Sequence, residues 1–105
     1  KNEVTLYEYK DHRISINSYA YFDEDNLVVD YWTLSDKYED EYFTRVKKEN
    51  LDLLYREFEI DKENEAELLI GLMNAFKGEN CYDKINEFFK QKNIPFLNSV
   101  QHDEN

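Results

Sequence analysis

The sequence has very little of what most catalytic and cofactor sites are built from. Its 105 residues include two glycines, one cysteine and two histidines. Two isolated glycines cannot form a glycine-rich loop that holds phosphate groups, and a lone cysteine cannot form an internal disulfide. His12 and His102 have no histidine or cysteine at the spacing of zinc ligands. These absences argue against a phosphate-binding loop, a disulfide framework and a zinc site.

A catalytic constellation is also missing from the sequence. Cys81 is expected to be a small buried hydrophobic side chain rather than a nucleophile. Asp23, Asp25 and Asp30 are candidates for paired carboxylates, but catalytic carboxylates need partly buried and differing environments. A turn full of solvated acids does not predict such environments. We therefore expect a protein that is not an enzyme and that has no cofactor and no bound metal.

The sequence contains no apolar run long enough to cross a bilayer, and no charged-then-apolar signal segment at its start. Together with the single cysteine, this favours the cytoplasm of a bacterial cell. Hydrophobic residues make up 41% of the chain and aromatic residues 16%. The length and composition predict one folded domain over residues 1–105 rather than a disordered acidic tail.

Basic residues are scarce, and the resulting negative charge is concentrated in the middle of the chain. The 24 acidic and 13 basic residues give a net charge of -11. Residues 23–67 hold sixteen of the acids and six of the bases, whereas residues 1–22 are balanced. Such a field repels nucleic-acid phosphate and attracts basic proteins. Alternatively, the acidity only keeps the protein soluble.

The first half of the sequence has the alternation of β-strands. Residues 13–22 alternate strictly, with Ile14, Ile16, Ser18, Ala20 and Phe22 on one face. Further strands are predicted over residues 4–10, 27–34 and 42–46. The connection at residues 23–26 is a predicted turn, in which Asn26 tolerates a positive φ. Short polar connections between consecutive strands predict an antiparallel β-meander.

After Lys47 the hydrophobic period becomes helical, which predicts helices over residues 49–58, after Asn64, and after Asn80. Asn64 and Glu67 resemble a capping box, and Gly78 suits the position that closes a helix. Pro95 ends the last helix, and residues 96–100 can return as an edge strand. The sequence therefore predicts an α+β fold, with about four strands in an antiparallel meander and about three helices on one face. The side chains that fit core periodicity are Phe22, Leu27, Val29, Leu54, Met73, Phe76, Ile85 and Phe88.

Several aromatic and acidic residues do not fit this core. If Leu27 and Val29 face the helices, then Val28, Asp30 and Trp32 face the other way, together with Tyr19 and Tyr21. Tyrosine and tryptophan commonly anchor interfaces, and surrounding carboxylates pair with lysine and arginine. Cross-strand aromatic pairs on a solvated sheet are the alternative explanation. The predicted partner-binding residues are Tyr19, Tyr21, Asp23, Glu24, Asp25, Asp30, Trp32, Asp36, Tyr38, Glu39, Asp40 and Glu41.

From residue 27 onward, the order of several short segments and their hydrophobic spacing resemble a class of small bacterial proteins. This class includes immunity proteins encoded beside polymorphic toxins. The resembling segments are Leu27–Asp30, Glu41–Val46, Glu49–Leu54, Leu68–Phe76 and Asn93–Phe96. The resemblance would predict a glycine shortly after Asp30, but residues 31–35 contain none. The resemblance implies an α+β fold and a toxin-neutralising role, and it supplies no catalytic residues.

Three functions from different classes follow as hypotheses. The first is an immunity protein that binds a basic toxin domain, such as a nuclease, and blocks its active site. The second is an acidic mimic of nucleic acid that occupies a DNA- or RNA-binding protein. The third is a structural or housekeeping domain without a charged partner. Direct binding to nucleic acid or to a membrane is not expected.

Overall fold

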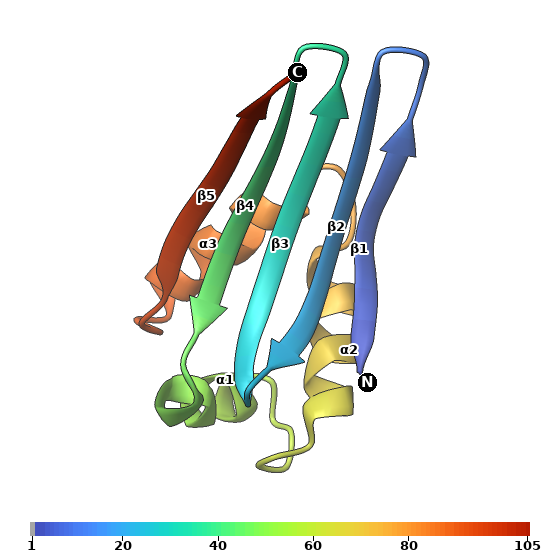
Figure 1. Cartoon of the computed structure of the whole chain (residues 1–105). Coiled ribbons are helices and arrows are strands. Elements are labelled where there is room, and N and C mark those ends of the chain that lie inside the picture. The colour runs from blue at the N-terminus through green and yellow to red at the C-terminus, as the bar shows by residue number, and fades with distance from the viewer. Residues whose placement is uncertain (1) are drawn as a thin grey trace.

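The computed structural model describes residues 2–105 and has an α+β fold, in which three helices pack on one face of a five-stranded antiparallel sheet (Figure 1). The strands lie side by side in chain order. They are β1 (Glu3–Lys10), β2 (Ile14–Asp23), β3 (Asn26–Ser35), β4 (Tyr38–Val46) and β5 (Leu97–Glu104). A short 3-10 turn (Lys48–Asn50) precedes α1 (Leu51–Glu57), and α2 (Glu65–Phe76) and α3 (Cys81–Gln91) follow. The predicted meander and the edge strand near the C-terminus are confirmed.

The hairpin between β2 and β3 shows how the chain turns without glycine. Glu24 and Asp25 have φ values of 51° and 70°. Positive φ at both central residues is the geometry of a type I′ turn, whose twist matches that of the flanking strands. Asn26, which tolerates a positive φ, is not one of the two central residues, because it already pairs with Asp23 as the first residue of β3.

The helix boundaries follow the predicted capping residues. The side chain of Asn64 accepts a hydrogen bond from the Glu67 amide at 3.2 Å, which satisfies one free donor of the first turn of α2. After α2, Gly78 has a φ of 127°, and its amide donates to the carbonyl of Leu6 in β1. A positive φ suits glycine, and this hydrogen bond ties the end of α2 to the edge of the sheet.

The core lies between the sheet and the helices. Leu27, Val29, Leu54 and Ile85 are fully buried, as their periodicity predicted. The other predicted core residues are only partly buried and pack around the margin of this core: Phe22, Met73, Phe76 and Phe88. Leu68, Leu69, Leu72 and Phe89 complete the buried helix surfaces.

A polar network attaches β5 to α3 at the end of this core. Thr44 is 1% exposed, and its Oγ1 lies 2.8 Å from the Tyr82 hydroxyl and 2.9 Å from Asn86 Oδ1. The Asn98 side-chain amide donates to both Thr44 and Asn86. Because buried polar groups are costly unless paired, this network fixes the side chains of β4, α3 and β5 relative to one another.

Two strands are longer than predicted. β4 begins at Tyr38 instead of residue 42, and β5 continues to Glu104. The strands therefore extend past the helices at the end of the sheet that holds the β1–β2 and β3–β4 turns (Figure 1). None of the helices within residues 2–105 has both the length and the apolar character needed to cross a membrane.

Candidate functional site

The sheet face that points away from the helices, here called the open face, gathers half of the predicted partner-binding residues. The register places Tyr19 opposite Asp30, Asp30 opposite Phe43, and Trp32 opposite Glu41. Ala20 and Val29 belong to the helix-side core, so their neighbours along the strands face the other way. The open face consists mainly of Tyr19, Tyr21, Val28, Asp30, Trp32, Glu39, Glu41, Phe43 and Arg45.

Two residues at the centre of the open face are buried although no helix covers them. Val28 is 0% exposed and Asp30 is 7% exposed. Their cross-strand neighbours are the large side chains of Tyr21 and Arg45 beside Val28, and of Tyr19 and Phe43 beside Asp30. These partly exposed side chains form a thin second layer over the sheet. The open face is therefore an ordered surface rather than a row of freely solvated side chains.

Asp30 is the most unusual group in this layer. Its Oδ1 accepts a hydrogen bond from the Tyr19 amide at 3.0 Å, and the Ser18 hydroxyl donates to its backbone carbonyl. Burial raises the pKa of Asp30 to about 6, and the negative charges of Glu41 and Glu3 add to the shift. Within residues 2–105 Asp30 belongs to no ion pair. A hydrogen bond with the Glu41 side chain also raises the pKa of Asp30, and among the residues that the structure describes no cation neutralises it.

Trp32 lies beside this carboxylate in a fixed orientation. Its indole nitrogen donates a hydrogen bond to Glu39 Oε2 at 2.6 Å, and the side chain is half-buried. Trp32 is thus on the open face and not under the helices. Burial also raises the pKa of Glu41, the cross-strand neighbour of Trp32, with a further contribution from the charge of Glu39. The indole therefore stands within a group of three carboxylates.

Val28 lies on the open face as its alternation with Leu27 and Val29 predicted, whereas Phe43 and Arg45 were not predicted there. The Arg45 guanidinium lies over the Phe43 ring at 5.6 Å from its centroid and pairs with Asp23 at 3.6 Å. Both lie within the predicted strand over residues 42–46, where alternation separates them from Tyr42 and Thr44, although the strand itself begins at residue 38. The charged run at residues 38–41 hid that strand start. The ring pairs described for residues 2–105 lie on the other side of the sheet: Tyr31–Tyr82, Tyr38–His102, Tyr42–Tyr82, Phe58–Phe88, Phe76–Phe88, Phe88–Phe89 and Phe89–Phe96.

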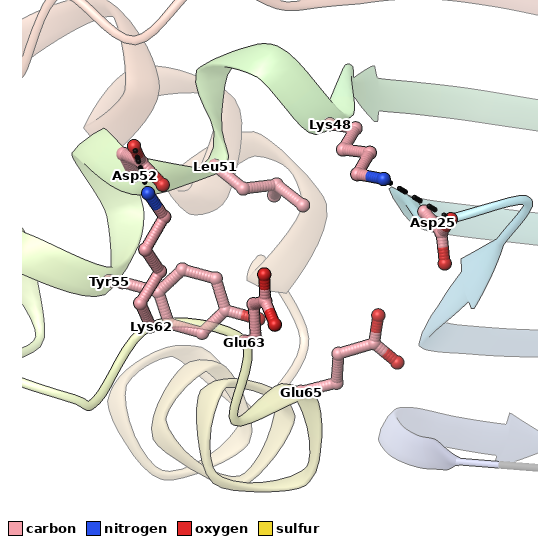
Figure 2. Close-up of a pocket in the computed structure, with 8 residues that line it drawn as sticks. All are labelled: Asp25, Lys48, Leu51, Asp52, Tyr55, Lys62, Glu63 and Glu65. Carbon is pink, nitrogen blue, oxygen red and sulfur yellow. Dashed lines mark ion pairs between the residues drawn. The ribbon is translucent and has the colours of Figure 1, made fainter.

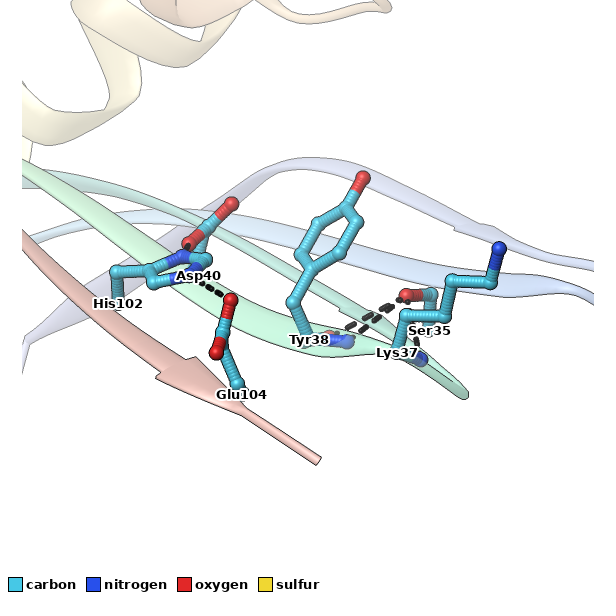
Figure 3. A network of polar contacts seen from close by, with 6 residues as sticks. All are labelled: Ser35, Lys37, Tyr38, Asp40, His102 and Glu104. Atoms are coloured by element: carbon cyan, nitrogen blue, oxygen red, sulfur yellow. Dashed lines mark hydrogen bonds and ion pairs between the residues drawn. The ribbon is translucent and has the colours of Figure 1, made fainter.

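Tyr38 and Asp40, two further residues of the predicted partner-binding set, do not lie on the open face. Both point to the helix side of β4, where Tyr38 stacks on His102 and Asp40 contacts the His102 ring nitrogen (Figure 3). The hydrogen bond with Asp40, followed by its charge, raises the pKa of His102. Successive side chains of a strand point to opposite faces. A strand that begins at Tyr38 therefore sends Glu39 and Glu41 to one face and Tyr38 and Asp40 to the other.

The remaining predicted acids lie at the two ends of the sheet. Asp23, Glu24 and Asp25 belong to the β2–β3 hairpin, and Asp36 lies in the β3–β4 turn at the opposite end. Asp25 pairs with Lys48 at 3.7 Å. These four residues therefore do not form one rim around Trp32. They only add negative charge at a distance.

An acidic hollow of ≈ 310 Å³ lies between α1, the start of α2 and the β2–β3 hairpin, which holds Asp25 (Figure 2). Its two lysines are already paired, Lys48 with Asp25 and Lys62 with Asp52 at 3.1 Å. Glu63 and Glu65 lie at the start of α2, where negative charge stabilises a helix. The charges of this hollow are explained by the fold itself.

Cys81 is fully buried, and burial raises the pKa of its thiol. A buried neutral thiol is a poor nucleophile. Within residues 2–105 no three histidine, cysteine or acidic side chains are grouped so that they could hold a metal ion. Comparison with known proteins finds no family model, no curated protein and no solved structure that matches this chain.

We expect Asp30→Asn to stabilise the protein at neutral pH. The folded pKa of Asp30, about 6, lies above the unfolded value of about 3.9. The wild type therefore loses stability as pH rises through this window, and asparagine does not, while its oxygen still accepts from Tyr19. Urea unfolding should give a gain on the order of 1–2 kcal/mol at pH 7.5 that vanishes near pH 4.

Asp36→Asn, in the exposed turn, is the matched control for this substitution. Because Asp36 is exposed, its substitution should give no comparable gain in stability at pH 7.5. If Asp30→Asn is less stable than the wild type at pH 7.5, the assignment of Asp30 as a destabilised carboxylate is wrong.

We expect the Cys81 thiol to react far more slowly in the folded protein than in urea, because it is buried and neutral. Absorbance of a thiol reagent under native and unfolding conditions measures this ratio. Rapid native labelling would contradict the assignment of Cys81 as a core residue.

Proposed function

We propose that this protein is a non-catalytic, acidic binding domain whose open face holds a basic protein partner, as an immunity protein that neutralises a basic toxin domain would. The observation that carries the proposal is Asp30, an acidic residue only 7% exposed that has no ion-pair partner within residues 2–105 and lies beside an oriented tryptophan. A titratable group with a strongly perturbed pKa on a structured surface is a candidate functional group.

The electrostatics of Asp30 support a cationic contact. Its carboxylate has lost most of its water and is further disfavoured by the charges of Glu41 and Glu3. A lysine or arginine from a partner would neutralise these charges in a partly desolvated environment, where such contacts are strongest. Arginine fits especially well, because its planar guanidinium can bond carboxylates and stack on neighbouring aromatic rings.

The aromatic residues favour a surface that binds a toxin domain over a surface that mimics nucleic acid. A mimic needs carboxylates spaced regularly like phosphates, whereas tyrosine, tryptophan, phenylalanine and Arg45 interrupt the acids of the open face. Large, oriented aromatic side chains contribute much contact area and lose little rotamer freedom on binding. Trp32 is already held by Glu39, so a partner would meet a preorganised indole.

A direct test uses the protein encoded immediately upstream of this gene, if that protein is a secreted toxin. Expression of its C-terminal domain alone should arrest cell growth, and co-expression of this chain should restore it. The two chains should co-purify as a complex. Failure of co-expression to protect, despite stable folding of both chains, would argue against an immunity role.

We expect the association rate with a basic partner to fall steeply as salt rises. Residues 23–67 carry a net charge of -10, and this field steers a basic partner over long range. Screening shortens its reach to about 8 Å at physiological ionic strength. Stopped-flow association at low and high salt measures the effect, and a flat rate would rule out steering by the acidic segment.

We expect Trp32→Ala to weaken partner binding by about 2 kcal/mol, mainly through faster dissociation. The side chain is half-buried on the open face, so the melting temperature should change little. Tyr38→Ala, on the other face of the sheet, is the control and should leave the dissociation rate unchanged. A normal dissociation rate for Trp32→Ala would place the partner elsewhere on the molecule.

A further inference from the structure

Three tyrosines form a cup on the helix side of the sheet, away from the open face. Tyr31 and Tyr42 are cross-strand neighbours on β3 and β4, and Tyr82 comes from the first turn of α3. The Tyr82 ring centroid lies 6.0 Å from that of Tyr31 and 6.2 Å from that of Tyr42. The Tyr82 ring is inclined by 47° to that of Tyr31 and by 50° to that of Tyr42, so it packs against both at a tilt. The three rings line a hollow of ≈ 220 Å³.

The position of the Tyr82 ring is set by the polar network below it. Its hydroxyl lies within hydrogen-bonding distance of the buried Thr44, and its backbone carbonyl accepts from the Asn86 side chain at 2.8 Å. These contacts hold the ring in place while Tyr42, 38% exposed, leaves the cup open to solvent. The cup is therefore preformed and accessible, as ligand sites usually are.

The charges at the rim are all negative. Besides the three rings, the hollow is lined by Glu79, Asn80 and Asp83, and by no lysine, arginine or histidine. Within residues 2–105 neither Glu79 nor Asp83 belongs to an ion pair. Burial raises the pKa of Tyr31, and the charges of Asp83 and Glu79 raise it further, so its ring stays a neutral phenol. The start of α3 adds a partial positive charge, which Asp83 in its first turn offsets.

We propose that this cup, formed by Tyr31, Tyr42 and Tyr82 with Glu79 and Asp83 at its rim, binds the head group of an organic cation such as a quaternary or alkylated ammonium. Aromatic ring faces attract a weakly hydrated cation, and nearby carboxylates complete its neutralisation. An anion would meet two carboxylates without a counter-charge. A neutral apolar group would gain nothing from Glu79 and Asp83.

The cup continues into a neighbouring hollow, which shares Tyr42, Tyr82 and Asp83 with it and runs toward Asn98 of β5. Lys90 lines this second hollow but not the cup. The arrangement suits a cation at the end of a longer chain, with the chain lying in the second hollow. Such a group is found both in small molecules and in modified lysine side chains of proteins.

The test uses choline as the probe and 3,3-dimethylbutanol as its uncharged counterpart of the same shape. Choline chloride, titrated at constant ionic strength, should cause saturable NMR shifts at the amides of residues 31, 42 and 79–83. The neutral alcohol should cause little shift at the same concentration. In a further arm, tighter binding of N-acetyl-trimethyllysine amide than of choline would assign the cation to a protein side chain, and the reverse order to a small molecule.

Variants of residues in the cup sharpen this test. Tyr42→Ala should weaken choline binding by about fivefold or more, because one wall of the cup is lost. Asp83→Asn should weaken it as well. Tyr38→Ala is the matched control, since Tyr38 lies on the same face of β4 with 37% exposure but outside the cup. It should leave choline binding unchanged.

Three results would overturn the proposal. They are the absence of any saturable shift with choline, equal binding of choline and the neutral alcohol, and unaltered choline binding by folded Tyr42→Ala. Because the cup and the open face lie on opposite sides of the sheet, none of these results bears on the binding of a basic protein.

Discussion

The sheet buries only one of its faces against helices, and the rest of the molecule follows from that constraint. Five long strands need side chains on both sides, yet α1, α2 and α3 supply apolar cover to one side alone. The uncovered side must then shield its own centre. It does so with long side chains such as Tyr21 and Arg45, which lie beside the fully buried Val28. The open face is therefore rigid without being part of the main core.

That solution has an energetic cost at Asp30. Tyr19 and Phe43, the cross-strand neighbours of Asp30 in the same layer, lie beside its carboxyl group, and burial raises its pKa to about 6. A valine or threonine at this position would satisfy the sheet at lower cost. Groups held in unfavourable states commonly serve binding or catalysis, because a ligand can relieve them. A cation brought by a partner would stabilise the negative charge of Asp30 in place of the water that burial removed. The proposed function therefore depends on this residue.

Much of the architecture could be predicted from the sequence, because its signals are local. Alternation at residues 13–22 placed Tyr19 and Tyr21 on the sheet face opposite to that of Ala20. The capping residue Asn64 marked the start of α2. The start of β4 could not be found this way, since its first residues are charged and their strand pairing comes from β3 and β5. The burial of Asp30 also depends on side chains of other strands. No local pattern shows that Tyr82 of α3 meets Tyr31 and Tyr42, which are about fifty and forty residues away.

Strand β4 links the two candidate sites without mixing them. Its alternate residues Glu41 and Phe43 lie on the open face, while Tyr42 and Thr44 point to the tyrosine cup and its supporting network. Because successive side chains of a strand point to opposite faces, a substitution at Phe43 can alter one surface and leave the other intact. The backbone of β4 is nevertheless shared, and the Thr44 network holds it against α3 and β5. Loosening that network would disturb both surfaces together, so the independence of the two sites rests on the packing around Thr44.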